Sequence, residues 1–420
     1  MLPTGSVAPR GAYASLRHVP FRLFVASIFT MELASHMRAV VVGWQIYAAT
    51  HDPLALGLIG LAEVLPFFAV VLFAGHVADT ANRKYVSVLA LAALCVCALA
   101  LFLLVAPDPS RQPVIPIYCV IAVSGVARSF LSPARTAMAA ELVPREDYEN
   151  SAAWRSSAWQ LAAVGGPAMG GLLYGYVGAH ATYALDLTLS LVALATLARV
   201  PYVRERTTAG ATALRDSLSD GIRFVLSQPV ILAALALDMF SVLFGGAVAL
   251  LPVFANEILH VGPKGLGVLQ AAPAAGAVVM SFYIAHRPPM QRAGRDLLIA
   301  VAVFGASIVA FALSRSFVLS LVVLAISGMA DNISVVIRST LLQVFTPRDM
   351  LGRVSAVNSI FIGSSNELGA FESGLAARLL GTVRSVVFGG CMTIGVVLVT
   401  AARVPSLRRL RQISGAADVQ

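Results

Sequence analysis

The sequence predicts an all-α membrane protein in which twelve transmembrane helices form two pseudo-symmetric six-helix bundles. Three observations lead to this fold class: the composition, the apolar runs and an internal repeat. Of the 420 residues, 58% are hydrophobic and only 12% are charged, whereas about a quarter of the residues of a soluble domain are charged. Runs of about 20 apolar residues recur along the chain, and each can cross the hydrocarbon core as a helix. This composition excludes a water-soluble enzyme.

The apolar runs define twelve expected spans. They are taken as helices because none shows the in-and-out alternation of a membrane β-barrel. The spans are expected at 21–49, 55–75, 85–106, 114–134, 156–178, 181–200, 229–256, 265–285, 297–314, 317–338, 356–378 and 384–402.

Polar segments divide these spans into two bundles. The first six spans form an N-terminal bundle, 21–200, and the last six form a C-terminal bundle, 229–402. The connection 201–228 is expected to be a cytoplasmic linker that contains an amphipathic helix. Residues 1–20 and 403–420 are expected to be cytoplasmic tails.

Lys and Arg predict the orientation. An even number of spans puts both termini on one side. If that side is cytoplasmic, the inner segments hold 23 of the 30 basic residues, the outer segments hold five, and two lie within spans. This positive-inside bias predicts that both termini are cytoplasmic. Orientation and contact with anionic lipid explain the net charge of +9, so no nucleic-acid partner is expected.

The two halves resemble each other, which is the third observation. A shift of 203 residues places Arg135-Thr136 on Arg338-Ser339, and a shift of 206 brings Glu32 onto Asp238. Two halves of like orientation are related by a pseudo-twofold axis along the membrane normal. Transporters with such repeats bind substrate between the halves, near the bilayer midplane.

The loop after the second span carries a motif. It reads Gly75-His-Val-Ala-Asp79-Thr-Ala-Asn82-Arg83-Lys84 and resembles the loop motif Gly-x-x-x-Asp-x-x-Gly-Arg-Lys/Arg of the major facilitator superfamily of secondary transporters. The resemblance implies that Gly75, Asp79, Arg83 and Lys84 act as a gating motif, a latch on the inner surface; a tight turn with orienting charges is the alternative. Asn82 stands where glycine is common. Since Asn tolerates the left-handed backbone, we expect the turn to be kept.

A second motif lies in the fifth span. Gly166-Pro167-x-x-Gly170-Gly171 resembles the antiporter motif of drug-exporting branches, although close packing of small residues in any membrane bundle is the alternative. The segments 251–255, 328–334 and 364–369 look most like the enterobactin-exporter-like group. The resemblance covers about residues 17–405 and implies the enterobactin-exporter-like or drug:proton antiporter branch.

Charges inside the N-terminal spans are candidate functional residues, because each is costly in lipid unless paired or hydrated. Glu32 and His36 lie four residues apart on one helix face, so they can exchange a proton. Both are proton-coupling candidates; a permanent ion pair of Glu32 with Arg38 or Arg128 is the alternative. Arg38 and Arg128 are also candidates for lining the substrate cavity. Asp186 is expected to meet the outer interface.

The C-terminal spans supply further candidates. The repeat aligns Arg128 with Asp331, so these opposite charges are expected to face the cavity between the halves; pairing within or between neighbouring helices is the alternative. The further proton-coupling candidates are Asp238, Asp331, Glu367 and Glu372. The further substrate-cavity candidates are Asp331, Arg338, Asn366, Phe240 and Phe361, although contact with lipid or the core is the default for the two phenylalanines.

These features favour a secondary transporter that exports an amphipathic small molecule, siderophore or drug-like, in exchange for protons by alternating access. The chain lacks a nucleotide-binding loop, so an ion gradient must supply the energy. The alternative is a proton-coupled symporter that imports a polar nutrient, which the motif in the fifth span disfavours. A membrane-embedded enzyme or receptor would need a catalytic constellation or a signalling domain, and neither is visible.

The expected partners follow from this interpretation. They are a small-molecule substrate, protons and membrane lipids, with the protein itself a monomer. No two histidines have metal-ligand spacing, so no metal and no cofactor are expected.

Overall fold

The computed structural model describes residues 13–106, 111–202, 214–287, 291–347 and 350–410, except for the side chains of a few residues within helices. The N-terminal half consists of α1 (Val19–Thr50), α2 (Pro53–Thr80), α3 (Arg83–Leu103), α4 (Val114–Glu141), α5 (Tyr148–Val177) and α6 (Ala179–Ala198). Two short 3-10 turns, η1 (Ser15–Arg17) and η3 (Arg145–Asp147), precede α1 and α5. The linker contains α7 (Leu214–Ser227).

The C-terminal half repeats this arrangement. It consists of α8 (Pro229–Phe244), η4 (Ala247–Leu250), α9 (Leu251–Val253), the π-helix η5 (Phe254–Ile258), α10 (Gly262–Ala285), α11 (Ala293–Leu313), α12 (Phe317–Phe345), α13 (Leu351–Leu380), α14 (Thr382–Arg403) and α15 (Pro405–Arg408). No strand occurs in the part of the chain that the structure describes. The predicted all-α fold with twelve spans in two bundles is confirmed.

Ten of the described helical segments are long and apolar enough to cross a membrane. The other two long helices, α5 and α13, are 30 residues each but more polar, since α13 contains Asn366, Glu367 and Glu372. Several helices also extend beyond the apolar runs, so α4 continues to Glu141 and α12 to Phe345. The polar extensions lie at the ends where the chain leaves the apolar layer.

The seventh span, expected at 229–256, corresponds to the apolar segment Pro229–Ile258. The span is interrupted at Gly245-Gly246, between α8 and η4. A β-carbon on Gly245 would come 2.6 Å from the Phe304 ring, and one on Gly246 would come 2.7 Å from Ser373 Oγ. The break therefore lets α11 and α13 pack closely against the backbone of this span.

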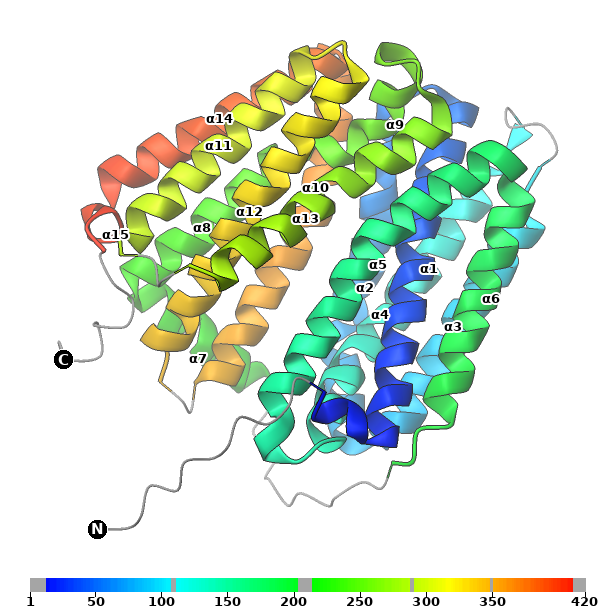
Figure 1. Ribbon diagram of the computed structural model, residues 1–420, viewed down its shortest axis with the longest axis vertical. Helices are drawn as coiled ribbons and strands as arrows, with labels where there is room; N and C mark the ends of the chain where they lie inside the picture. The colour runs from blue at the N-terminus through cyan, green and yellow to red at the C-terminus, as the bar shows by residue number, and fades with distance from the viewer. Residues whose placement is uncertain (1–12, 107–110, 203–213, 288–290, 348–349, 411–420) are drawn as a thin grey trace.

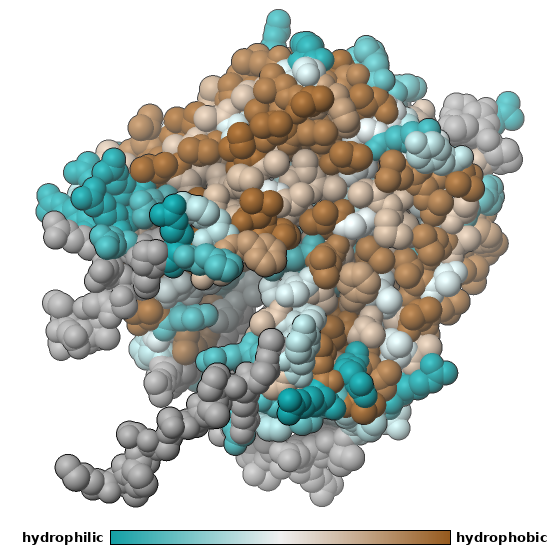
Figure 2. Space-filling view, in the orientation of Figure 1, coloured by the Kyte–Doolittle hydropathy of each residue, from teal (hydrophilic) through white to brown (hydrophobic). Residues whose placement is uncertain are grey.

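The two halves lie side by side and converge at one end (Figure 1). We call the end where α1 begins and α14 ends the terminal side, and the opposite end the far side. Across the boundary, α5 packs against α10 and α2 packs against α13. Figure 2 shows apolar residues over the broad middle of the surface and hydrophilic residues gathered towards the two ends, as expected of a protein that spans a bilayer.

One buried ion pair holds α1 against α6 in the N-terminal half. The Nε and Nη2 of Arg38 donate to the two carboxylate oxygens of Asp186 at 2.9 Å and 3.0 Å. Both residues are buried, Asp186 to 1% exposure, so the expectation that Asp186 meets the outer interface is wrong. A bidentate arginine satisfies the carboxylate and removes its need for water.

Candidate functional site

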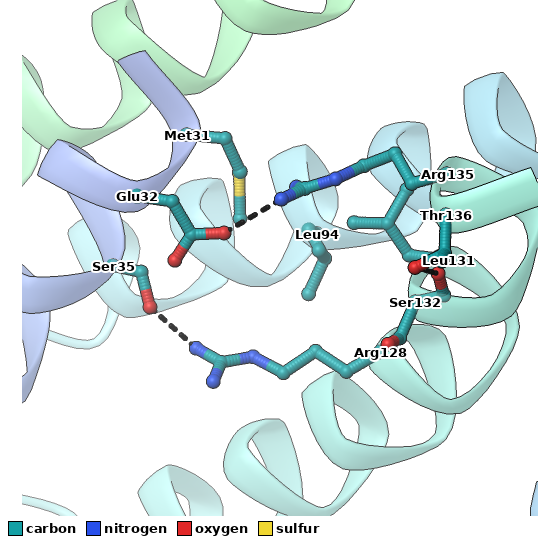
Figure 3. Close-up of a pocket in the computed structure, with 9 residues that line it drawn as sticks. All are labelled: Met31, Glu32, Ser35, Leu94, Arg128, Leu131, Ser132, Arg135 and Thr136. Carbon is teal, nitrogen blue, oxygen red and sulfur yellow. Dashed lines mark hydrogen bonds and ion pairs between the residues drawn. The ribbon is translucent and has the colours of Figure 1, made fainter. Parts of the chain in front are cut away.

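A cavity of about 190 Å³ lies in the N-terminal half between α1 and α4. Polar side chains line it together with Met31, Leu94 and Leu131; they are Glu32, Ser35, Arg128, Ser132, Arg135 and Thr136. Figure 3 shows the two arginines reaching from α4 towards α1. Charged groups at this depth of a helical bundle therefore border a space that water can enter.

Glu32 forms an ion pair within this cavity. Arg135 Nη2 donates to Glu32 Oε1 at 2.9 Å, and the two side chains keep 21% and 23% of their surface exposed. The alternative weighed for Glu32, an ion pair with Arg38 or Arg128, names the wrong partner, because Glu32 pairs with Arg135. Arg135 reaches Glu32 because it is long enough to extend from α4 back to α1.

Arg128 contacts two other residues. Its Nη2 donates to Ser35 Oγ at 2.5 Å, and its Nη1 lies 3.0 Å from Glu63 Oε1 of α2. This pairing with a neighbouring helix was the alternative to the expectation that Arg128 and Asp331 face the cavity between the halves. Arg128 is still partly exposed to the cavity, with 39% of its side-chain surface accessible.

The internal repeat reappears as a second ion pair. Asp238 of α8 pairs with Arg338 of α12, and these residues are the repeat equivalents of Glu32 and Arg135. Asp238 is only 7% exposed and Arg338 only 4%. The same pair thus occurs twice, partly exposed in the N-terminal half and buried in the C-terminal half. Because Asp238 and Arg338 are buried, they do not line an open cavity in this conformation.

Two carboxylates, Asp331 and Glu367, form no ion pair or hydrogen bond with any residue that the structure describes. Asp331 is half-buried in α12 and surrounded by little charge. Glu367 of α13 lies at the boundary of the halves: a β-carbon on Gly60 of α2 would come 2.9 Å from Glu367 Oε2. Its charged neighbours are Glu63 and Arg128.

The three residues Glu63, Arg128 and Glu367 form a cluster that joins the halves, which we call the boundary cluster. Glu63 and Arg128 come from the N-terminal half and Glu367 from the C-terminal half. Arg128 pairs with Glu63, and Glu367 is a second carboxylate near them. Like charges at short distance favour protonation of one of them, so this arrangement is suited to holding a proton.

Arg38 is not placed in the cavity in this conformation. Its pairing with Asp186 directs the guanidinium into the packing between α1 and α6. His36 lies closer to the cavity: Glu32 and Arg128 are its charged neighbours, and its ring is 6.1 Å from that of Trp159. Its Nε2 is buried and has no hydrogen-bond partner among the residues that the structure describes.

The remaining C-terminal candidates are dispersed. Asn366 is exposed, whereas Glu372 is half-buried beside Ser373. Phe361 packs against a buried cluster around Leu235 and Val357. Phe240 stacks on Phe244 at 6.4 Å between ring centroids.

The glycines of the fifth span contact two different helices. β-carbons on Gly166 and Gly170 would come 2.6 Å from His36 Cβ and 2.7 Å from the Met37 carbonyl oxygen, so these glycines let α5 pack on α1. Gly171 faces α10, where its β-carbon would come 2.5 Å from Gly267 Cα.

Pro167 joins the same contact across the two halves. A β-carbon on Gly267 would come 2.5 Å from the Pro167 carbonyl oxygen. The motif thus permits backbone-to-backbone packing between the halves as well as within one of them.

Polar contacts accompany this closure on the far side. Tyr47 donates to Glu257 of η5, Arg378 Nη1 lies 3.3 Å from Asp52 Oδ2, and Lys264 Nζ lies 3.5 Å from the centroid of the Tyr176 ring. Each joins one half to the other. Sequence patterns alone do not reveal these partners, because the residues lie near helix ends where polar side chains are common.

The gating motif lies on the terminal side. The side chain of Asp79 lies outside the described residues. Arg83 pairs with Glu141 of its own half, and Glu141 also accepts from Tyr202. Burial and this carboxylate raise the pKa of Tyr202 to about 12, so the phenol remains a donor.

The left-handed turn expected at Asn82 is not present. Asn82 has φ −72° and ψ 114°, which is extended backbone. Its side chain instead accepts from the Lys84 amide at 3.0 Å and caps the first turn of α3.

Two solved structures show the same fold. A bacterial homologue of the human lysosomal transporter Spinster aligns with a TM-score of 0.71 at 15% identity, covering 95% of this chain and 99% of that one. A D-xylose–proton symporter aligns with a TM-score of 0.69 at 14% identity, covering 94% and 99% of the two chains.

Sequence comparison identifies nearer relatives. The enterobactin exporter EntS of Citrobacter koseri is 26% identical over 402 residues, and that of Escherichia coli O1:K1 is 27% identical over 406 residues; each alignment covers 94% of both chains. The family model described as transmembrane secretion effector matches residues 10–417. The chain therefore belongs to the transmembrane secretion effector family of the major facilitator superfamily of transporters.

Proposed function

We propose that this protein exports an amphipathic small molecule in exchange for protons by alternating access, with its terminal side in the cytoplasm. The observation that carries the proposal is the partly exposed Glu32–Arg135 pair in a bundle whose halves are joined on the far side. The orientation is supported by the 23 basic residues of the inner segments, against five in the outer segments. The conformation described above is then inward-facing, ready to receive substrate from the cytoplasm.

The boundary cluster supplies the proton step of this proposal. When α2 and α13 close, Glu367 comes near Glu63, whose ion-pair partner is Arg128. A proton on Glu367 removes the repulsion and stabilises the closed far side. Protons bound from outside are thereby carried inwards as the far side closes. Substrate leaves in the opposite step, when the far side opens.

Glu32 has a different role in this scheme. Its partner Arg135 keeps it paired in the inward-facing state, so we assign the carried proton to Glu367. The pair keeps two charges in the cavity wall while adding no net charge. Water and substrate can reach it, because both side chains remain about one-fifth exposed.

The relatives suggest the substrate class. Two of them are named enterobactin exporters, and this chain matches them along nearly its full length. We therefore propose a siderophore or a chemically similar amphipathic compound as the substrate. The membrane concerned is the bacterial inner membrane.

The test uses inverted membrane vesicles from a host strain that lacks its own enterobactin exporter. Enterobactin is the probe, and an acidic vesicle lumen supplies the gradient. We expect enterobactin to accumulate in the lumen, and its addition to release protons from the lumen. Vesicles without the protein serve as the control. Uptake into right-side-out vesicles together with protons would contradict export and favour the importer.

A further inference from the structure

Arg155 has no acidic partner in the part of the chain that the structure describes, and it stands close to the cavity. The other two arginines of this wall are matched, Arg128 with Glu63 and Arg135 with Glu32. The Nε of Arg155 is buried and has no hydrogen-bond partner. Its charged neighbour is Arg135, which carries the same sign. Arg155 therefore adds a positive charge near the cavity that no described carboxylate pairs with.

Helix registers give the depth of the three arginines. Arg155 lies seven residues from the start of α5 and Arg135 lies six residues from the end of α4, so both are about 10 Å from the terminal ends of their helices. Arg128 lies two turns deeper on α4. Arg155 and Arg135 thus lie near the terminal side, where a cytoplasmic substrate would enter, and Arg128 lies deeper.

The neighbouring side chains add two further features. Ser132 and Thr136 supply hydroxyl donors on the face of α4 that lines the cavity. Trp159 follows Arg155 by one helical turn, is 51% exposed and contacts the His36 ring. A guanidinium beside an exposed indole is suited to an anionic group on an aromatic or otherwise apolar body, because the arginine binds the charge and the ring covers the apolar part.

We propose that Arg155, together with Arg135, forms a subsite for an anionic group of the transported molecule. This inference rests on the proposed function and narrows its substrate class to organic anions. The anion binds in the N-terminal half, whereas the proposed proton carrier Glu367 belongs to the C-terminal half. Outward movement of an anion and inward movement of a proton are both favoured by a membrane potential that is negative inside.

Binding of benzoate and benzamide to the full-length protein in detergent tests the subsite. The two probes share a shape and differ in charge. Quenching of tryptophan fluorescence is the readout, because Trp154 and Trp159 flank Arg155 among only three tryptophans. We expect saturable quenching by benzoate and none by benzamide. Arg155→Gln should weaken benzoate binding at least about tenfold, while Arg155→Lys should retain part of it.

Controls separate this effect from misfolding. Arg315→Gln removes an exposed arginine far from the cavity and should bind benzoate like the unmodified protein. If Arg155→Gln is not monodisperse, Arg155→Leu, which keeps the apolar part of the side chain, replaces it. Three results would each overturn the subsite: equal binding of benzoate and benzamide, unchanged benzoate binding after Arg155 is replaced, or no saturable benzoate binding. The assay needs no gradient, so failure of proton-driven export would leave its result standing.

Discussion

Replacing Gly171 with Val is expected to abolish export by holding the far side open. In the closed far side, a β-carbon at this position would come 2.5 Å from Gly267 Cα and 2.6 Å from the Pro263 carbonyl oxygen. Both obstacles are backbone atoms of the opposite half, so no side-chain rotation relieves the overlap. Packed interfaces of this kind respond by shifting between conformations. The far side should therefore separate, and the inward-facing state should be lost.

Spin labels at Val177 and Val318 would measure the separation, since both residues are exposed on the far side of opposite halves. The labels require a background without the four cysteines, of which Cys119 and Cys391 are exposed. Gly171→Val should lengthen the distance between the labels and abolish enterobactin accumulation. Gly165→Val is the matched control, because its β-carbon meets only the Leu33 side chain at 3.5 Å. An unchanged distance in Gly171→Val would refute the proposed closure.

Replacing Glu367 with Gln is expected to uncouple transport from the proton gradient. The amide imitates the protonated acid, so α2 and α13 can still close beside Glu63. It cannot release a proton, however, and no proton is carried when the far side reopens. Accumulation driven by an acidic lumen should fall at least about tenfold, whereas exchange of labelled for unlabelled enterobactin across the vesicle membrane should persist.

Glu149→Gln provides the control for this variant, because Glu149 is an exposed carboxylate at the terminal end of α5. It should accumulate enterobactin normally. If Glu367→Gln keeps full proton-driven accumulation, another group carries the proton. Loss of both accumulation and exchange would instead place Glu367 in substrate binding or folding, and would remove the basis for its role as proton carrier.

The sequence predicted the architecture because apolar runs and the positive-inside bias report directly on membrane crossing. It also predicted that Glu32 and Asp238 are equivalent positions, and the structure gives each an arginine from the equivalent helix, Arg135 and Arg338. The repeat thus extends from sequence to contact. The repeat does not predict how deeply each pair is buried. One pair is partly exposed and the other is buried, because burial depends on how the neighbouring helices pack.

Ion-pair partners were the least predictable feature. Span positions give the depth of a charge but leave the facing direction of each helix open, so Asp186 and Arg38 could not be matched before the packing of α1 on α6 was known. In the sequence, Arg155 is one of the 23 basic residues of the inner segments that predict the orientation, and its place near a helix end suggested no further role. Its lack of an acidic partner emerges only when the neighbours of each arginine are known. Likewise, Gly245 and Gly246 give no sign in an apolar run that the span breaks there.

Accessibility of Ser132 tests the central claim most directly. Ser132 is an exposed residue of α4 that lines the cavity, so Ser132→Cys in a background without the native cysteines reports where the cavity opens. A membrane-impermeant maleimide should label it from the terminal side in the absence of a gradient, and from the far side in Gly171→Val. Labelling from the same single side in both proteins, or from neither side, would contradict alternating access to this cavity.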